Sequence, residues 1–459
     1  MSLLEQSPAR RLLREAQVPP TALAGWSQRL QDFLHRYLPC FFRKEHRQMV
    51  PVLLAGKLSA LQRKTAEPIA HHAGRHRKPV QHFVGAGKWD DEAVLTELRQ
   101  HVAAEVGTAD GVLLLDGSAF VKSGEDSCGV ERQWCGRVGK IENCQVGVFL
   151  GYVSDRGQAL LDRRLYLPRP WAEDTERRTQ THVPAAVVFQ TKLEIALDLV
   201  ERCRTVPHGW VVGDDEFGRA TAFRQTLRRR ERYLLDVPSN TLVRDLAERR
   251  PDGRKPPFER VDGWAARQPA RRWRKVVVRD GEKGRSVVRA LEARVQTKDE
   301  DGRVGRSERL VVVRPVEQSG ERSYALSNDL EVALAGLVRV KHCRPVIEQL
   351  LQLGKGEVGL GHYEVRSWVG WHHHMTLSLL ALWYLQLERQ AVGKKSPGAD
   401  GAVVAAVAGG VVGAGADVGG VAGRDPGHGP AYGGSPHLPL AADQQLLPAA
   451  APQTRFIDR

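Results

Sequence analysis

GVLLLDGSAF, residues 111–120, is the stretch that decides the fold. Its apolar run is continuous rather than alternating, which is typical of a central strand that is buried on both faces. The run ends at Asp116, and GWVVGDDEFG at residues 209–218 contains a second such run, which ends at Asp214. We expect both carboxylates to stand at strand ends, at the edge of the sheet where active sites of open α/β sheets usually lie.

The segments around these two runs complete the element order of an α/β fold. In chain order they are strands at 143–154 and 158–168, a helix at 189–205, the Asp214 strand, a helix at 219–231 and a strand at 233–238. Three strands, a helix, a strand, a helix and a strand are the order of the ribonuclease-H-like fold, a mixed sheet flanked by helices. Its first and fourth strands are neighbours, so Asp116 and Asp214 should lie close together.

A third carboxylate, Glu348, lies in a helical pattern with apolar neighbours. Arg344 precedes it by four residues and Lys355 follows it by seven, so the three share one helix face. Three carboxylates on separate rigid elements can hold two divalent ions, and the flanking cations suit a phosphate-bearing substrate. Hard oxygen ligands favour two Mg²⁺ ions, with Mn²⁺ as an alternative. The combination predicts phosphodiester chemistry on nucleic acid, with Asp116, Asp214 and Glu348 as metal ligands.

Each carboxylate also has an ordinary structural explanation. Asp116 could cap a turn, Asp214 could cap a helix, and Glu348 could pair with Arg344 one turn earlier. Only the three together, in this order, favour catalysis. Asp215 and Glu216 compete with Asp214 for the second position. Successive side chains of a strand point to opposite faces, so Asp214 and Asp215 cannot both point into one site, and we assign Asp214 to it.

The composition is compatible with a polyanionic partner. Sixty-eight Lys and Arg residues against 54 Asp and Glu residues give a formal charge of +14, which favours nucleic acid through counterion release. Six cysteines without a CxxC pair indicate neither a zinc ribbon nor a disulfide framework. The N-terminus lacks the apolar core of a signal peptide, and the most apolar run, residues 375–387, is too short to span a bilayer. We expect a cytoplasmic protein without a membrane partner.

The chain divides into five predicted regions. They are a helical N-terminal region at 1–105, a first core segment at 106–241, an inserted antiparallel β subdomain at 242–320, a second core segment at 321–392 and a low-complexity tail at 393–459. The helical region contains the basic segment 71–83, which is either a DNA-contacting module or a solvated loop. Its candidate DNA contacts are Arg75, Arg77 and Lys78.

The inserted strands alternate apolar and basic residues, so we expect solvent-facing strands whose basic face could lie along DNA. Neighbouring residues diverge by about 100° around a helix, so His372, His373 and His374 should face DNA or solvent rather than share a metal. The tail has neither Lys nor Glu from Asp400 onward. It is either a flexible low-complexity extension or the product of a reading-frame shift in a GC-rich gene.

Several stretches resemble the DDE transposases of bacterial insertion sequences, in the branch with a β-rich insertion before the catalytic glutamate. In order they are LLLDGSAFVKSGEDSCGVERQW (113–134), GKIENCQVGVFL (139–150), RRLYLPRPWAED (163–174), WVVGDDEFGR (210–219) and RPVIEQLLQLGKGEVGLGHYEVRSWVGWHHHMTL (344–377). The resemblance covers roughly residues 25–390. It implies a catalytic, metal-binding triad of Asp116, Asp214 and Glu348 in a nucleoid-associated bacterial enzyme. It further implies that the enzyme cuts and joins double-stranded DNA at the inverted terminal repeats of its element, as a dimer when two ends are synapsed.

The related Y-x2-R-x3-E-x6-K pattern is met at Arg344, Glu348 and Lys355, but Lys341 stands in place of the tyrosine. The resemblance places Arg344, Lys355 and Lys341 at the DNA. Gly117 is a second departure, because the family more often has an acidic residue there, and the family's basic, helical C-terminus is not recognisable. Two alternatives remain, a catalytically inactive transposase-derived DNA-binding protein and a ribonuclease-H-like nuclease without strand transfer.

Overall fold

The computed structural model describes residues 25–393, apart from residues 137, 282–283 and 318–320. The expectations for the first 24 residues and for the tail from residue 394, including the frameshift hypothesis, lie outside this part of the chain. No helix in the described part combines the length and the apolar character needed to cross a membrane.

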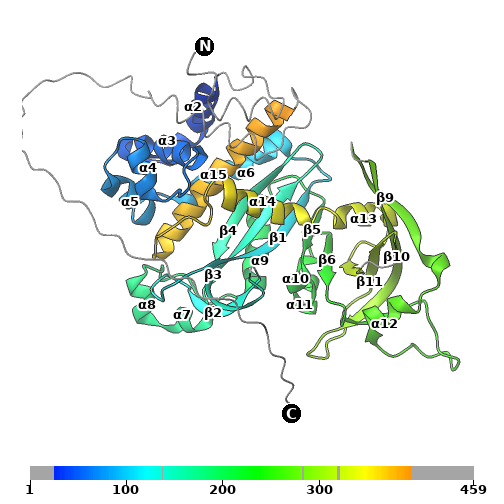
Figure 1. Cartoon of the computed structure of the whole chain (residues 1–459). Coiled ribbons are helices and arrows are strands. Elements are labelled where there is room, and N and C mark those ends of the chain that lie inside the picture. Colours follow the sequence, from blue (N-terminus) through cyan, green and yellow to red (C-terminus); the bar gives the residue numbers. More distant parts are fainter. Residues whose placement is uncertain (1–24, 137, 282–283, 318–320, 394–459) are drawn as a thin grey trace, which may run out of the picture. The chain divides into compact units, whose positions relative to one another are not determined.

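A 12-stranded mixed sheet carries the fold (Figure 1). Its strands are β1 (Val112–Val121), β2 (Glu131–Cys135), β3 (Lys140–Val153), β4 (Gln158–Leu165), β5 (Trp210–Gly213), β6 (Tyr233–Val237), β7 (Leu242–Asp245), β8 (Glu259–Arg260), β9 (Arg274–Gly281), β10 (Gly284–Lys298), β11 (Glu308–Pro315) and β12 (Ser323–Ser327). β1 pairs with β3 antiparallel and with β5 parallel, and β5 pairs with β6 parallel. These pairings confirm the ribonuclease-H-like sheet and place the first and fourth predicted strands side by side.

The inserted strands extend the core sheet instead of forming a sheet of their own. The strand order is β2-β3-β1-β5-β6-β12-β11-β10-β7-β8, with β4 also on β3 and β9 also on β10. The junction is β12, whose Leu326 lies opposite Leu235 of β6 in an antiparallel pair. The insert nevertheless has its own hydrophobic cluster, which includes Trp264, Leu291 and Val312. Alternation predicts the strands but not this junction, because pairing between distant strands leaves no local signal.

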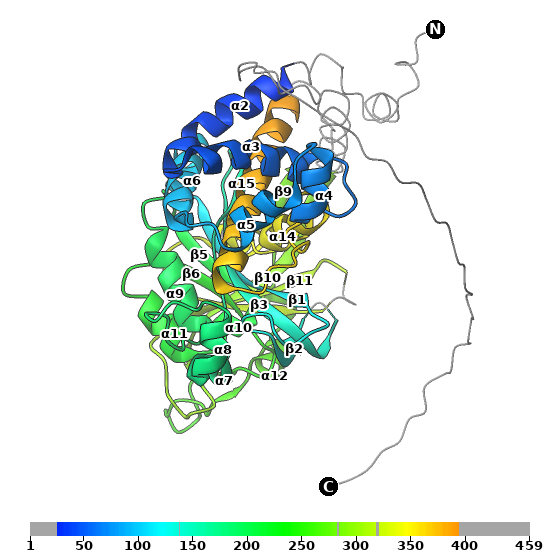
Figure 2. The same cartoon turned by 90° about the vertical axis from the view of Figure 1, so that its left-hand side faces the viewer.

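Helices cover the sheet and build the N-terminal region (Figures 1 and 2). They are α2 (Trp26–Tyr37), η3 (Leu38–Cys40), α3 (Lys44–Leu58), α4 (Ala66–His72), α5 (Arg77–Gly85), α6 (Asp91–Val106), α7 (Arg169–Glu173), α8 (Thr175–Gln180), α9 (Lys192–Arg202), α10 (Asp215–Gly218), α11 (Thr221–Leu227), α12 (Val261–Ala266), η4 (Ala270–Arg272), α13 (Leu334–Lys341), α14 (Pro345–Glu357) and α15 (Trp368–Gly393). The predicted helix at 219–231 is thus shorter than expected. The predicted helical region before Glu348 is broken at Pro345, because proline lacks the N–H that a continuous helix needs and suits a first helical position.

Helix α15 is buried between the N-terminal helices and the sheet, since it contacts α3, α5 and α6 as well as β4. This burial corrects the expectation for the three consecutive histidines. His372 donates to the carbonyl of Trp368 (2.9 Å), and His374 interacts with the carbonyl of Leu360 (3.2 Å). His373 stacks on Trp89, with ring centroids 3.7 Å apart. They face neither DNA nor solvent, because an all-round apolar helix is enclosed on every side.

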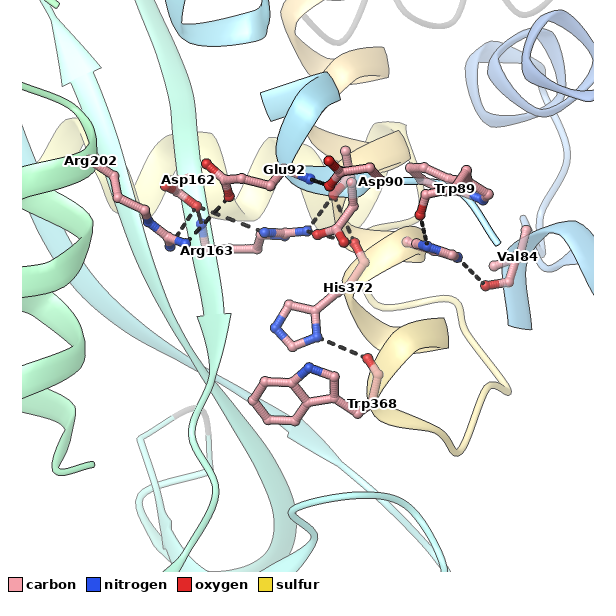
Figure 3. A network of polar contacts seen from close by, with 12 residues as sticks. Val84, Trp89, Asp90, Glu92, Asp162, Arg163, Arg202, Trp368 and His372 are labelled. Carbon is pink, nitrogen blue, oxygen red and sulfur yellow. Dashed lines mark hydrogen bonds and ion pairs between the residues drawn. The ribbon is translucent and has the colours of Figure 1, made fainter. Parts of the chain in front are cut away.

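A buried ionic network ties β4, α6, α9 and α15 together (Figure 3). Asp162 of β4 is fully buried, and it accepts from Arg99 of α6 (2.9 Å) and Arg202 of α9 (3.2 Å). The neighbouring Arg163 pairs with Asp91 of α6 and donates to the carbonyl of His372 in α15 (3.0 Å). The network therefore fixes the N-terminal region and the last helix against the core sheet.

Acid should destabilise the protein through the α15 histidines. Burial lowers the pKa of His372 to about 3 and the pKa of His373 to about 4. The unfolded chain titrates near 6.5, so below that pH it binds protons that the folded chain does not, and stability falls as the pH falls. For His372 alone, the free energy of unfolding should drop by about 2 kcal/mol between pH 6.5 and pH 5. Urea unfolding at the two pH values measures the drop.

His372→Asn is the control, because its amide offers a donor near the position of Nδ1 without titrating. The pH dependence of this variant should be smaller than that of the wild-type protein by the same amount. An identical pH dependence in both proteins would contradict the assignment.

Candidate active site

Three aspartates follow equivalent positions on neighbouring parallel strands. Leu115 of β1 lies opposite Gly213 of β5, which lies opposite Leu235 of β6. The next residues on the three strands are Asp116, Asp214 and Asp236. Because neighbouring strands are only about 4.8 Å apart, this register gathers carboxylates at one edge of the parallel part of the sheet.

The expectation that Asp116 stands at the end of its strand is wrong, because β1 runs from Val112 to Val121. β1 continues to Val121 because it stays paired with β3 over its whole length. Its parallel pairing with β5 stops at Leu115, one residue before Asp116. The position that matters is therefore the end of the β1–β5 ladder, and Asp214 follows the last residue of β5 at the same level.

Burial disfavours the charged forms of both carboxylates. It raises the pKa of Asp116 to about 7, and the negative charge of Asp214 adds to the shift. It likewise raises the pKa of Asp214 to about 6, against the opposing effect of Arg344. A cation bound nearby would favour the charged forms of both carboxyl groups, and shifted pKa values of this kind cluster at functional sites.

Glu348 reaches the same place from α14, which contacts β1 and β3. Arg344, at the start of this helix, lies between two acids: Nη1 is 2.5 Å from Glu348 Oε1 and Nη2 is 3.8 Å from Asp214 Oδ2. Asp214 also caps the short helix α10, accepting from the backbone N–H of Glu216 at 3.0 Å. The ordinary structural roles of the two acids are thus both present: Glu348 pairs with Arg344, and Asp214 caps a helix. Neither role prevents the carboxylates from lying close together.

A cavity of about 850 Å³ brings the predicted residues together. It is lined by the predicted ligands and by two of the predicted DNA contacts, namely Asp116, Asp214, Glu348, Arg344 and Lys355. The Lys355 ammonium lies 5.0 Å from the centroid of the Phe120 ring. The cavity thus combines acids that suit a metal with cations that suit phosphate.

The structure places further residues at the cavity, of which Lys192 and Trp134 were not singled out from the sequence. Glu216 lines the cavity and pairs with Lys192 at the start of α9 (2.7 Å). Trp134 of β2 lines it as well, with a side chain that is 62% exposed. Asp215 is instead paired with Arg219 (3.1 Å). The capping-box pattern at Thr191 could have located Lys192, whereas β2 gave no sequence signal.

The remaining predicted DNA contacts lie elsewhere. Lys341 is buried and forms an ion pair with Asp236, so an internal partner takes the place of the predicted DNA contact. Arg75, Arg77 and Lys78 are exposed around the start of α5, and none of them lines the cavity. Arg77 pairs with Glu67 (2.6 Å). The basic segment is thus mainly a helix with charged side chains in solvent.

The donor chemistry of the cavity fits a divalent cation. Asp116, Asp214 and Glu348 offer hard oxygen donors, and burial together with the charge of Asp214 raises the pKa of Asp116, an effect that a bound cation would oppose. As the side chains lie, no three acidic, histidine or cysteine groups of the described residues are close enough to hold one ion. Arg344 supplies the positive charge beside Glu348 in this arrangement, so an ion bound there would take over the role of its guanidinium.

Comparison with known proteins identifies the family. The profile of the DDE superfamily endonucleases matches residues 36–285, which is more than half of the chain and includes Asp116 and Asp214 but not Glu348. A comparison with curated proteins gave no match. Among solved structures, the chain is similar to a piggyBac transposase in a synaptic complex with hairpin DNA, at 10% identity and a TM-score of 0.39, over 80% of this chain and 70% of that one. The chain belongs to the DDE superfamily endonucleases.

Proposed function

We propose that this protein is a transposase of an insertion sequence, which cleaves DNA at inverted terminal repeats and transfers the cut strand. The observation that carries the proposal is the cavity in which Asp116, Asp214 and Glu348 meet Arg344 and Lys355. Membership of an endonuclease family supports the cleavage step. Joining two ends requires two active sites, so we propose a dimer in the synaptic complex.

In this proposal the three carboxylates hold two Mg²⁺ ions, with Mn²⁺ as a possible substitute. When bound, such ions activate the attacking oxygen and stabilise the leaving oxygen of an in-line displacement. The chain's own cations bind and orient the DNA: Arg344 and Lys355 contact phosphate at the cavity, where each is beside the carboxylates. Arg75, Arg77 and Lys78 contribute charge from the N-terminal region.

The first test is cleavage of supercoiled plasmid by the purified full-length chain. We expect nicking that rises with Mg²⁺ concentration and stops when EDTA is added, because the carboxylates alone cannot neutralise the charge of the displaced oxygen. Binding without nicking at any concentration of Mg²⁺ or Mn²⁺ would refute the proposal. It would favour a transposase-derived protein that only binds DNA.

A second test separates a transposase from a nuclease without strand transfer. Short inverted repeats on both sides of the gene would supply the natural substrate. A labelled duplex ending in that repeat should be joined covalently to a target plasmid in the presence of Mg²⁺. Nicking without joined product would favour the nuclease.

A further inference from the structure

Four basic residues line up across the extension of the sheet. Arg289 of β10 lies opposite Lys275 of β9 on one side and opposite Arg314 of β11 on the other. Val313 lies opposite Ser323, so Arg322, which precedes Ser323, lies beside Arg314. We call Lys275, Arg289, Arg314 and Arg322 the basic row.

The basic row lies on the face of the sheet that α12 covers. Side chains two residues apart on a strand share a face, and the same-face neighbours of Arg289, Arg314 and Arg322 belong to the hydrophobic cluster of Trp264 in α12. These neighbours are Leu291, Val312 and Tyr324. The intervening residues Ala290 and Val313 belong instead to the main core on the opposite face. The row thus borders the α12 cluster at the point where helix cover ends.

The carboxylate cavity belongs to the other face. Ala325, which lies opposite Asp236, is part of the main core, and Asp236 pairs with Lys341 of α13. Helix α13 leads into α14, which carries Glu348 into the cavity. The basic row and the catalytic carboxylates therefore face opposite sides of one continuous sheet.

The charges of the basic row are not balanced within the described part of the fold. None of the four side chains has an ion pair with an acid among the described residues, although ion pairs are frequent elsewhere in the insert, as at Arg309 and Glu292. Arg314 stacks on Trp273, with its guanidinium carbon 4.2 Å from the ring centroid. Partial burial lowers the pKa of Arg314, and the nearby Arg322 and Arg289 lower it further. Like charges on directly opposite residues destabilise a sheet, so an anion bound along the row would relieve this repulsion.

We infer that the basic row is a second DNA-binding surface, which takes the phosphate backbone of a duplex on the face away from the carboxylates. Four cations on successive strands span about 14 Å, too far for a small anion to bridge. Duplex DNA carries one charge per about 1.7 Å of its axis, so it presents several phosphates over that length. The inference rests on the proposed function, since it takes DNA as the polyanion. An acidic protein segment is the competing ligand.

Salt-dependent DNA binding tests the row. A 30-base-pair duplex of arbitrary sequence is titrated with the full chain in EDTA, by fluorescence anisotropy at several salt concentrations. Lys275→Ala/Arg289→Ala should flatten the slope of log K against log salt by about 2, because about 0.9 counterion is released per phosphate contact. The matched control is Arg229→Ala/Arg306→Ala, which removes two exposed charges outside the row. Equal slopes in the two double variants would overturn the inference and leave an acidic protein segment as the ligand.

Folding and catalysis are kept separate from this readout. Lys275→Glu changes one exposed side chain, so it carries little risk to folding and should weaken binding more than Arg306→Glu. Thermal unfolding of each variant checks that the fold is intact. Affinity is measured without metal, so it does not depend on catalysis. If the salt slope of Lys275→Ala/Arg289→Ala is flattened but the wild-type chain does not nick DNA, only the proposed function is refuted. If the wild-type chain nicks DNA and the salt slope of Lys275→Ala/Arg289→Ala is unchanged, only the inference about the basic row is refuted.

Discussion

Replacing Asp214 with Asn should reduce Mg²⁺-dependent nicking by about 1000-fold or more, which corresponds to about 4 kcal/mol of transition-state stabilisation. Asp214 stands at the end of β5 beside Asp116, and its Oδ2 faces Arg344. The amide of Asn occupies the same volume and can still accept the capping hydrogen bond from the Glu216 backbone. The fold should therefore survive, while a charged oxygen donor is lost from the proposed metal site.

Asp215→Asn is the matched control for this experiment. The adjacent acid is the same residue type, but its carboxylate pairs with Arg219 and does not line the cavity. Its nicking rate should stay within a few-fold of wild type. Plasmid nicking is measured in both variants over a range of Mg²⁺ concentrations, with DNA binding measured separately in EDTA. If Asp214→Asn nicks DNA as fast as Asp215→Asn does, our assignment of the site is refuted.

Replacing Asp162 with Asn should produce the largest loss of stability, about 3–5 kcal/mol. Asp162 is fully buried and accepts from Arg99 and Arg202, while its own backbone neighbour Arg163 is also buried (Figure 3). Without the carboxylate, the buried guanidinium of Arg99 keeps its positive charge but loses its buried counter-ion, and only the partly exposed Glu92 remains as its acid partner. Removing one partner of a buried ion pair is costly because the remaining charge stays out of water.

The control for Asp162→Asn is the same substitution in an exposed pair. Asp126 pairs with Arg366 at 3.0 Å, and both side chains are mostly in solvent. Surface pairs contribute about 0–1 kcal/mol, so Asp126→Asn should have little effect. Urea unfolding at pH 7 compares the two variants. A loss for Asp162→Asn no larger than for Asp126→Asn would contradict the structural role of the network.

The element order of the core was predictable because its signals are local. A continuous apolar run at residues 112–115 marks a buried strand, and the capped start of α6 is visible as an acid at Asp90 before a helical pattern. The neighbour relation between the first and fourth strands came from the known order of the fold rather than from any local signal. The sequence could not show that β1 continues past Asp116, because the extension depends on pairing with β3.

The histidines of α15 show the limit of reasoning from residue type. A run of three polar, titratable residues reads as an exposed feature, since most such residues lie at surfaces. Here the helix is enclosed by α3, α5, α6 and β4, and backbone carbonyls satisfy the imidazole N–H groups. Only packing from distant segments decides this burial. The same applies to Lys341, whose partner Asp236 is more than 100 residues away along the chain.

By itself, the sequence determined the residue types of the site: two aspartates after apolar runs, and Glu348 on a helix with Arg344 and Lys355 on its face. The tertiary structure decided which of these residues meet. Strand register sets Asp116 beside Asp214, the packing of α14 brings Glu348 to them, and the cavity adds Lys192 and Trp134. Local patterns fix periodicity and end signals, whereas register and burial arise from contacts between distant segments, whose partners no single stretch encodes.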